Sequence, residues 1–228
     1  MMHDMLALTR LLQLASPALP VGAYSYSGGL ESAIEEGSVI DATSAETWLR
    51  DVLEFSVGSF ELPLFFRMMQ AIAADDYLKL AGWNALFASG RESAELRSET
   101  LQMAHALIAL LKDLPFSTAD ELAKLRGLRA PTYPAAYAFA VHHMKVDHKA
   151  AMVGYVWSWL ENQVMAAIKA VPLGQTAGQR ILASVGDELP AVAQRAMTLA
   201  DDELANFAPG LAIASSRHET QYSRLFRS

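Results

Sequence analysis

Residues 147–172 read DHKAAMVGYVWSWLENQVMAAIKAVP, and this stretch predicts a long helix. Asp147 is a favourable N-cap residue, because its carboxylate can accept a hydrogen bond from a free backbone N–H of the first turn. Pro172 ends the helix, because the residue before a proline is disfavoured in the helical conformation. Between them, large apolar side chains recur on one side of the helix, at Trp157, Leu160, Val164, Ile168 and Val171. The stretch therefore favours a helical fold.

An upstream segment predicts a second amphipathic helix. Thr43 and Glu46 have the spacing of a capping box, in which each side chain pairs with the backbone N–H of the other residue. One apolar stripe follows, at Trp48, Leu49, Val52 and Leu53. Pro63 interrupts the next apolar run, and it predicts a kink or a break because proline lacks the N–H that a helix needs.

Further helix signals continue downstream. Thr118 and Glu121 form another predicted capping box, and Gly127 can end the short helix that they begin. Thr176 predicts the start of one more helix. Residues 126–134 predict a loop, and no segment shows the period-two alternation of a strand. We therefore predict one all-α domain over residues 1–228.

This domain is predicted to be a helical bundle of about eight to ten helices. Residues 1–15 form an N-terminal segment, and residues 211–228 form a flexible C-terminal tail with a docking role. The apolar fraction of 52%, dominated by Ala and Leu, agrees with helices rather than sheets.

The charge and the cysteine count exclude several classes of protein. A net charge of −7 argues against nucleic-acid binding, which needs a surplus of Lys and Arg on one face. The absence of cysteine removes disulfides and thiolate metal sites, and it fits a reducing compartment. The start of the chain lacks a secretory signal pattern, and no apolar stretch reaches the ~20 residues of a bilayer span. We therefore expect a cytoplasmic protein without membrane contact.

Residues 101–111 are apolar nearly all round a helix, which is typical of a central core helix or of one that a partner covers. The core interpretation is favoured, and a self-association surface stays open. His105 falls on this apolar stripe and is predicted to be buried.

His142, His143 and His148 are close in the sequence, but their spacing does not support a permanent metal site. On a helix His142 and His143 point about 100° apart, so they are not an i,i+4 pair. Asp147 begins a new helix, which leaves His148 free to diverge from them. We therefore predict no stable metal site, although neutral imidazole is a good nickel ligand.

Residues 16–31 read SPALPVGAYSYSGGLE and cannot form a continuous helix, because the run contains two prolines and three glycines. It nevertheless contains two tyrosines and a glutamate, which is unusual chemistry for a simple connection. We expect Tyr24, Tyr26 and Glu31 to contribute to partner binding, with Tyr26 the more structural tyrosine.

This run resembles the signature SPxLPVGx[FY]SYSxGLE of the urease accessory protein F family. Three further stretches are similar to motifs of the same family: WSWLENQ at 157–163, VPLGQTAGQR at 171–180, and RHE followed by YSRLFRS within 217–228. The four matches follow the family's order from residue 16 to residue 228. On these motifs the chain is identified as a member of the family.

The resemblance implies a non-enzymatic, all-α scaffold that acts in urease maturation. Such a scaffold binds accessory protein D, called H in some organisms, and recruits the GTPase accessory protein G. The complex loads nickel into apo-urease during GTP hydrolysis. The resemblance therefore implies that the partner binds GTP, that the assembled complex handles nickel, and that this chain holds no cofactor stably. It also implies a homodimer.

Two polar segments are candidates for partner contacts. Gln175, Gln179 and Arg180 form one polar face at the start of a predicted helix, which suits recognition of another protein's surface. Recruiting the GTPase through this face is simpler than inserting Arg180 as an arginine finger.

In the tail, arginines alternate with Tyr222, Leu225 and Phe226, and arginine and aromatic residues are enriched at interface hot spots. We predict that the tail orders on its partner. The tail residues expected to bind are Arg217, His218, Glu219, Tyr222, Arg224 and Arg227.

Two rival functions fit the sequence less well. A helical enzyme would place Tyr24, Tyr26 and Glu31 in one pocket, but the sequence contains no complete catalytic set. A nickel chaperone acting alone would need clustered histidine or cysteine ligands for tight binding, which the sequence lacks.

Overall fold

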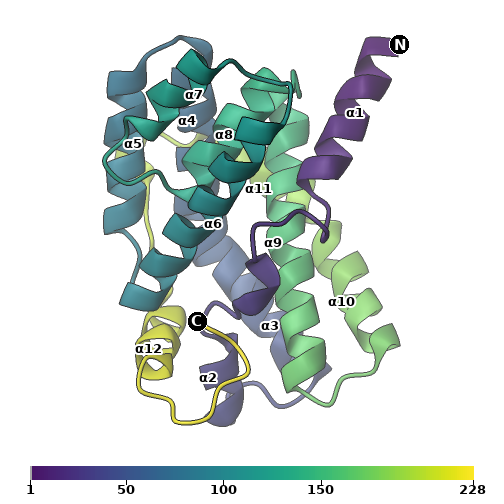
Figure 1. The fold of residues 1–228 in the computed structure, drawn as a ribbon. Helices are drawn as coiled ribbons and strands as arrows, with labels where there is room; N and C mark the ends of the chain where they lie inside the picture. The colour runs from purple at the N-terminus through teal and green to yellow at the C-terminus, as the bar shows by residue number, and fades with distance from the viewer. Residues whose placement is uncertain (1) are drawn as a thin grey trace.

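The computed structural model describes residues 2–228, with side chains from residue 5 onward. Its helices are α1 (Met2–Leu14), η1 (Ala23–Ser25), α2 (Leu30–Glu35), α3 (Ala42–Val52), η2 (Leu53–Glu61), α4 (Leu62–Ala73), α5 (Tyr77–Ser89), α6 (Ala94–Asp113), α7 (Ala119–Arg126), α8 (Tyr133–His143), α9 (His148–Ala170), α10 (Gln175–Gly186), α11 (Leu189–Thr198), η3 (Asp201–Glu203) and α12 (Pro209–His218). Over the described residues there is no strand, and the predicted all-α helical bundle is confirmed (Figure 1).

Helix α9 runs through the middle of the bundle and organises it (Figure 1). The predicted cap is confirmed, because Asp147 accepts the backbone N–H of Ala150 at 3.0 Å. The helix ends at Ala170, two residues before Pro172, as predicted. Around α9 pack α1, α2, α3, α4, α10 and α11.

A second layer forms where α8 packs against both α4 and α6. Every residue of α8 from Pro134 to Val141 is buried, as expected for a helix that is apolar all round. Aromatic rings join this layer to α9: Phe65 of α4 stacks on Tyr155 of α9 with ring centroids 4.5 Å apart.

Pro63 lies near the start of α4, and the chain around it stays helical. Helices α3, η2 and α4 follow one another without a gap, and η2 is a π-helix. Pro63 has no N–H to offer to the carbonyl of Ser59, and that oxygen accepts the N–H of Ala205 at 3.2 Å instead. The predicted break is therefore wrong: a π-helix and an external donor accommodate the proline.

The start of α3 also differs from its prediction. Its N-cap is Asp41, whose carboxylate accepts the N–H of Ser44 at 2.8 Å, while the Ser44 hydroxyl accepts the N–H of Asp41. Glu46 instead forms an ion pair with Arg50 at 2.7 Å. The Thr43–Glu46 capping box is therefore wrong, because Asp41 and Ser44 have the same spacing two residues earlier and make the cap first.

Of two other predicted helix starts, one is confirmed. Thr118 and Glu121 form the reciprocal capping box of α7, and Gly127 follows its last residue. Helix α10, by contrast, has Gly174 as its N-cap and no side-chain cap, so Thr176 lies inside the first turn.

Helix α6 belongs to the core, as predicted from its apolar pattern. Met103, Leu107, Ile108 and Leu111 are buried. His105, predicted to be buried, is exposed instead, because it borders a surface groove beside the loop after α7. None of the described helices combines the length and hydropathy that a bilayer crossing requires.

The C-terminal segment (residues 219–228) returns to the loop between α1 and α2, where Figure 1 shows it beside α12 and α2. The N–H of Arg227 donates to the carbonyl of Ser25 at 2.8 Å, and the N–H of Ser27 donates to the carbonyl of Ser228 at 2.8 Å. The predicted flexibility of the tail is therefore wrong, because these long-range bonds hold the segment against the fold.

Candidate functional site

Two glycines shape the loop that precedes α2. Gly28 and Gly29 have φ of 60° and 81°, in the left-handed region that side chains disfavour. A Cβ on Gly29 would lie 3.1 Å from the backbone nitrogen of Ser215 in α12, and one on Gly28 would lie 3.2 Å from the amide nitrogen of Gln163 in α9. The glycines therefore allow the loop to contact α9 and α12 closely.

Glu31, in the first turn of α2, is the anchor for the C-terminal segment. Its carboxylate accepts the backbone N–H of Leu225 at 2.6 Å and that of Phe226 at 3.0 Å. The residue is buried. Glu31 was predicted to contact a partner, but in the isolated chain all of these contacts are internal.

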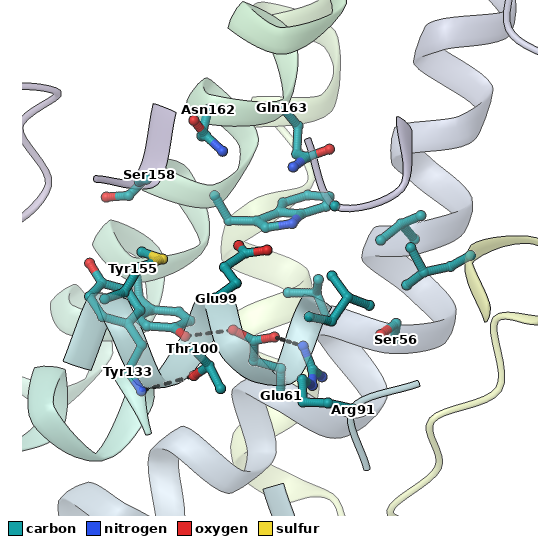
Figure 2. Close-up of a pocket in the computed structure, with 18 of the residues that line it drawn as sticks. Ser56, Glu61, Arg91, Glu99, Thr100, Tyr133, Tyr155, Ser158, Asn162 and Gln163 are labelled. Carbon is teal, nitrogen blue, oxygen red and sulfur yellow. Dashed lines mark hydrogen bonds and ion pairs between the residues drawn. The ribbon is translucent and has the colours of Figure 1, made fainter. Parts of the chain in front are cut away.

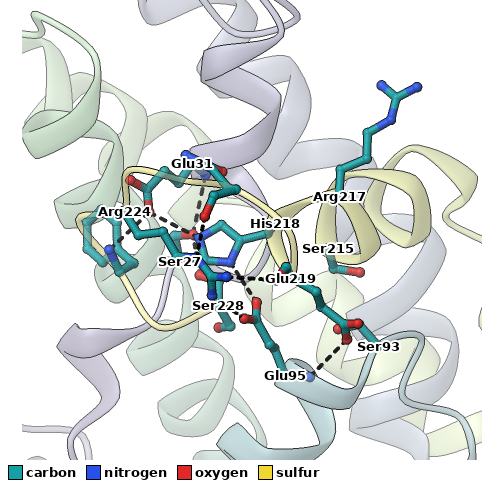
Figure 3. A network of polar contacts seen from close by, with 12 residues as sticks. Ser27, Glu31, Ser93, Glu95, Ser215, Arg217, His218, Glu219, Arg224 and Ser228 are labelled. Atoms are coloured by element: carbon teal, nitrogen blue, oxygen red, sulfur yellow. Dashed lines mark hydrogen bonds and ion pairs between the residues drawn. The ribbon is translucent and has the colours of Figure 1, made fainter.

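His218, the last residue of α12, lies between two carboxylates from different helices. Its Nε2 is 3.1 Å from a carboxylate oxygen of Glu31, and its Nδ1 is 2.6 Å from one of Glu95 on α6. Figure 3 shows the ring between these two side chains, and it is fully buried. Arg224 binds the other oxygen of Glu95 at 2.5 Å, which ties the C-terminal segment to the same carboxylate.

Two more predicted tail residues form ordinary contacts with the fold. Glu219 accepts the N–H of Ala94 at 2.6 Å, so its negative charge lies at the N-terminus of α6, where the helix dipole favours it. Arg217 is exposed and pairs with Glu36 just after α2, at 2.5 Å.

The outer face of the C-terminal segment is the part open to other molecules. The side chain of Tyr222 is fully exposed, and that of Leu225 is 71% exposed. Arg227 is exposed, whereas Phe226 is buried and its ring lies under the Lys169 ammonium. The segment therefore has an anchored inner face and an outer face that exposes large apolar side chains.

The two tyrosines of the loop occupy different environments. Tyr26 is buried, and its hydroxyl donates to the side chain of Gln102 at 2.8 Å. Tyr24 is only half-buried, and burial together with the nearby Glu161 carboxylate raises the pKa of Tyr24 to about 12. Tyr24 is therefore the loop tyrosine that retains accessible surface.

The predicted polar face of α10 is exposed and lies away from the C-terminal segment. Gln175, Gln179 and Arg180 are all exposed near the start of the helix. Helix α10 packs on α9 and α3, and in Figure 1 it lies on the other side of α9 from α12. The structure thus brings the loop and tail residues together and keeps the α10 residues separate.

A cavity of about 120 Å³ lies among η2, α6 and α9 (Figure 2). Its wall includes a buried polar group at the end of η2: Glu61 pairs with Arg91 at 3.2 Å and accepts the hydroxyl of Tyr155 at 2.5 Å. Burial, and then the Glu61 charge, hold the pKa of Tyr155 well above its usual value, so this hydroxyl stays protonated.

Glu99 also lines the cavity and reaches the C-terminal segment. Its carboxyl group accepts the hydroxyl of Ser228 at 2.7 Å. Burial raises the pKa of Glu99 to about 7, and the Ser228 hydrogen bond and Arg91 oppose that rise. This carboxyl therefore changes charge near neutral pH.

The cavity does not match the predicted enzyme pocket. From the loop before α2, its wall takes Ala23 and Gly28 but not Tyr24, Tyr26 or Glu31. The three residues expected to line one pocket are thus directed elsewhere.

Three polar residues of α6 belong to the site without having been predicted. They are Glu95, Glu99 and Gln102, which bind His218, Ser228 and Tyr26 respectively. Their spacing of i, i+4 and i+7 is a sequence signal for a polar stripe on one side of a helix. The stronger apolar pattern of residues 101–111 conceals it.

Among the side chains from residue 5 onward, no group of three or more His, Asp and Glu residues is arranged to hold a metal ion. His142 and His143 are adjacent, with ring centroids 5.0 Å apart. Burial lowers the pKa of both rings.

Comparisons with known proteins place this geometry in context. The family model for UreF matches residues 39–186. A protein of an Azoarcus species, named urease accessory protein UreF, is 52% identical over 98% of this chain and 97% of its own length. Proteins with the same name from a Janthinobacterium species and from Dechloromonas aromatica are each 48% identical, over 97% and 100% of this chain and 98% and 100% of their own lengths.

Proposed function

The chain belongs to the UreF family of urease accessory proteins, and we propose that it is a non-catalytic scaffold for urease maturation. In this proposal it binds the D-type (or H-type) accessory protein and recruits the GTPase accessory protein G. The partner binds GTP, the assembled complex handles nickel, and the scaffold holds no cofactor of its own. Apo-urease receives the nickel.

The observation that carries the proposal is the separation of two exposed surfaces on one rigid bundle. The first is the outer face of the C-terminal segment, with Tyr222 and Leu225 exposed. The second is the polar face of α10, with Gln179 and Arg180 exposed. Because α9 lies between them, both surfaces are free to bind at once, which a scaffold requires. We assign the first to the D-type partner and the second to the GTPase.

A scaffold of this kind acts by differential affinity. If it binds one nucleotide state of the GTPase more tightly, then by linkage it changes the stability of that state and couples hydrolysis to metal release. The chain needs no catalytic group for this role. We further propose that it is a homodimer and that it works in the cytoplasm.

Co-purification tests the proposal directly. The full chain is mixed with the D-type protein and the GTPase, with GTP or GDP, and separated by size-exclusion chromatography with light scattering. We expect a complex of all three whose amount depends on the nucleotide, built on two copies of this chain. If one of the two proteins does not bind the chain in the presence of GTP or of GDP, the assignment of its surface is overturned. Turnover of a small molecule by the isolated chain would instead support an enzyme.

A further inference from the structure

His218 is placed so that both of its ring nitrogens face acceptors. Nδ1 lies 2.6 Å from Glu95 and Nε2 lies 3.1 Å from Glu31. A neutral imidazole carries one N–H and one lone pair, whereas the protonated ring carries two N–H donors. The neutral ring would therefore point a lone pair at a carboxylate in a site without solvent. Only the protonated ring matches both neighbours.

The charges around the ring lead to the same conclusion. Glu31 faces it from α2, Glu95 faces it from α6, and Arg224 of the C-terminal segment binds Glu95. The residues next to His218 in the sequence are both charged. Arg217 pairs with Glu36, and Glu219 lies against the N-terminus of α6. With a protonated ring, the two carboxylates that it touches are balanced by His218 and Arg224. With a neutral ring, the buried Glu31 carboxylate keeps its backbone N–H donors but has no cationic partner, which is costly away from water.

This charge balance is connected to the C-terminal segment through shared atoms. The Glu31 oxygen that faces His218 also accepts the N–H of Phe226, at 3.0 Å, and its other oxygen accepts the N–H of Leu225. Glu95 likewise binds both His218 and Arg224. If the two carboxylates turn away from a neutral ring toward water, they withdraw the acceptors that hold residues 224–226. Loss of one proton is thereby converted into loss of several bonds.

We propose that residues 219–228 form a proton-dependent latch on the loop before α2, closed while His218 carries a proton on both ring nitrogens and opened when it loses one. Histidine is a side chain that gains or loses a proton more readily than most, so a pH series tests the latch directly. Opening releases the Glu31 carboxylate and the backbone groups of Ser25 and Ser27 that the segment binds. The inference rests on the contacts of the isolated chain and does not depend on the partners proposed above.

Glu99 is a second titrating group at the far end of the segment. Its carboxyl group accepts the Ser228 hydroxyl at 2.7 Å, and this bond favours the ionised form, whereas burial favours the protonated form. The latch is therefore assigned to His218, and the His218→Gln variant separates the two groups.

A spin label on the latch tests the proposal. The chain has no cysteine, so Ser223→Cys provides a single attachment site on an exposed position of the segment. We expect the nitroxide spectrum to change from immobile to mobile as the pH is raised. Where one proton is linked to closure, the opening constant rises by up to about tenfold per pH unit.

Matched variants separate the latch from general unfolding. A label at Ala183→Cys, on the exposed side of α10, should keep the same mobility over the whole range. In the Ser223→Cys background, His218→Gln should give a mobile label at every pH, while His105→Gln, which changes an exposed histidine, should leave the transition in place. Circular dichroism follows helix content throughout.

Three results would overturn the latch: a Ser223 label whose mobility does not change with pH, a His218→Gln protein that keeps the full transition, or a transition that both labels share. If His218→Gln fails to fold, the pH series on the two labelled proteins that retain His218 still decides between these outcomes.

Discussion

The His218 ring lies 3.1 Å from the carboxylate of Glu31, although 187 positions separate the two residues in the sequence. This contact joins the end of α12 to the first turn of α2, and the same carboxylate accepts two backbone N–H groups of the C-terminal segment. Both residues belong to motifs that identify the family, and their contact shows that these motifs form one structural unit.

Replacing Glu31 should destabilise the whole bundle. Glu31→Ala leaves His218 and two N–H groups without their acceptor, and breaking a buried pair of this kind costs about 3 kcal/mol or more. Urea denaturation measures the change in the free energy of unfolding. Glu35→Ala, an exposed glutamate of the same helix, should stay within about 0.5 kcal/mol of the unmodified chain. Equal effects from the two variants would contradict the anchoring role of Glu31.

Removing Tyr26 should mainly lower folding stability, whereas removing Tyr24 should mainly weaken partner binding. Tyr26→Ala removes a buried aromatic ring and should lower stability by about 3 kcal/mol or more. Tyr26→Phe keeps the ring and loses only the bond to Gln102, worth about 1 kcal/mol. Tyr24→Ala should weaken partner binding more than folding, because the residue keeps exposed surface. Denaturant melts beside pull-downs check this, and a Tyr24→Ala variant as unstable as Tyr26→Ala would refute it.

Two glycines with similar backbone conformation provide a matched pair. Gly29 and Gly37 have φ of 81° and 76°, but only at Gly29 would a Cβ meet another atom, the backbone nitrogen of Ser215 at 3.1 Å. Gly37→Ala should cost only the strain of the left-handed conformation, about 1–2 kcal/mol. Gly29→Ala should cost clearly more, because α12 would have to move. Melting temperatures that fall equally would show that the close approach to α12 is unimportant.

Arg180→Ala should reduce recruitment of the GTPase with little effect on stability. Arg180 is exposed near the start of α10, and truncating an exposed side chain changes stability by about 0.5 kcal/mol or less. Binding to the GTPase is measured by calorimetry or pull-down, together with urease activation. Arg129→Ala, an exposed arginine after α7, is the control and should bind normally. Unimpaired recruitment by Arg180→Ala would refute the assignment of this face.

Glu99 gives the folding stability a pH dependence of defined sign. Its pKa is raised from 4.5 to about 7 in the folded chain, so between these values the folded state holds a proton that the unfolded chain releases. The contribution is therefore fully present below pH 4.5 and is lost as the pH rises through 7. The slope should be below ~1.4 kcal/mol per pH unit, because the group borders the cavity and is partly screened.

Urea melts at several pH values test this expectation. Glu99→Gln keeps a hydrogen-bonding partner for Ser228 and should flatten the decline, while Glu35→Gln should not. An unchanged slope in Glu99→Gln would assign the pH dependence to other groups.

Local interactions are what the sequence by itself determined. Asp147 caps α9 and Pro172 follows its end, because a cap and a proline act on backbone groups within a few positions. The same reason explains the box of Thr118 and Glu121. It also explains why the predicted capping box of α3 was wrong. Asp41 and Ser44 have the same spacing as Thr43 and Glu46, and spacing alone does not show which of the two pairs forms the cap.

Only the tertiary structure decided which polar residues face inward. Glu31 and His218 are polar residues of types that usually lie on the surface, yet both are buried here and hold the C-terminal segment. Gln179 and Arg180 have similar chemistry and remain on the surface. The difference arises because a buried charge is stable only beside its partners, and those partners come from helices far apart in the sequence. Their meeting depends on how α2, α6 and α12 pack, which no local pattern specifies.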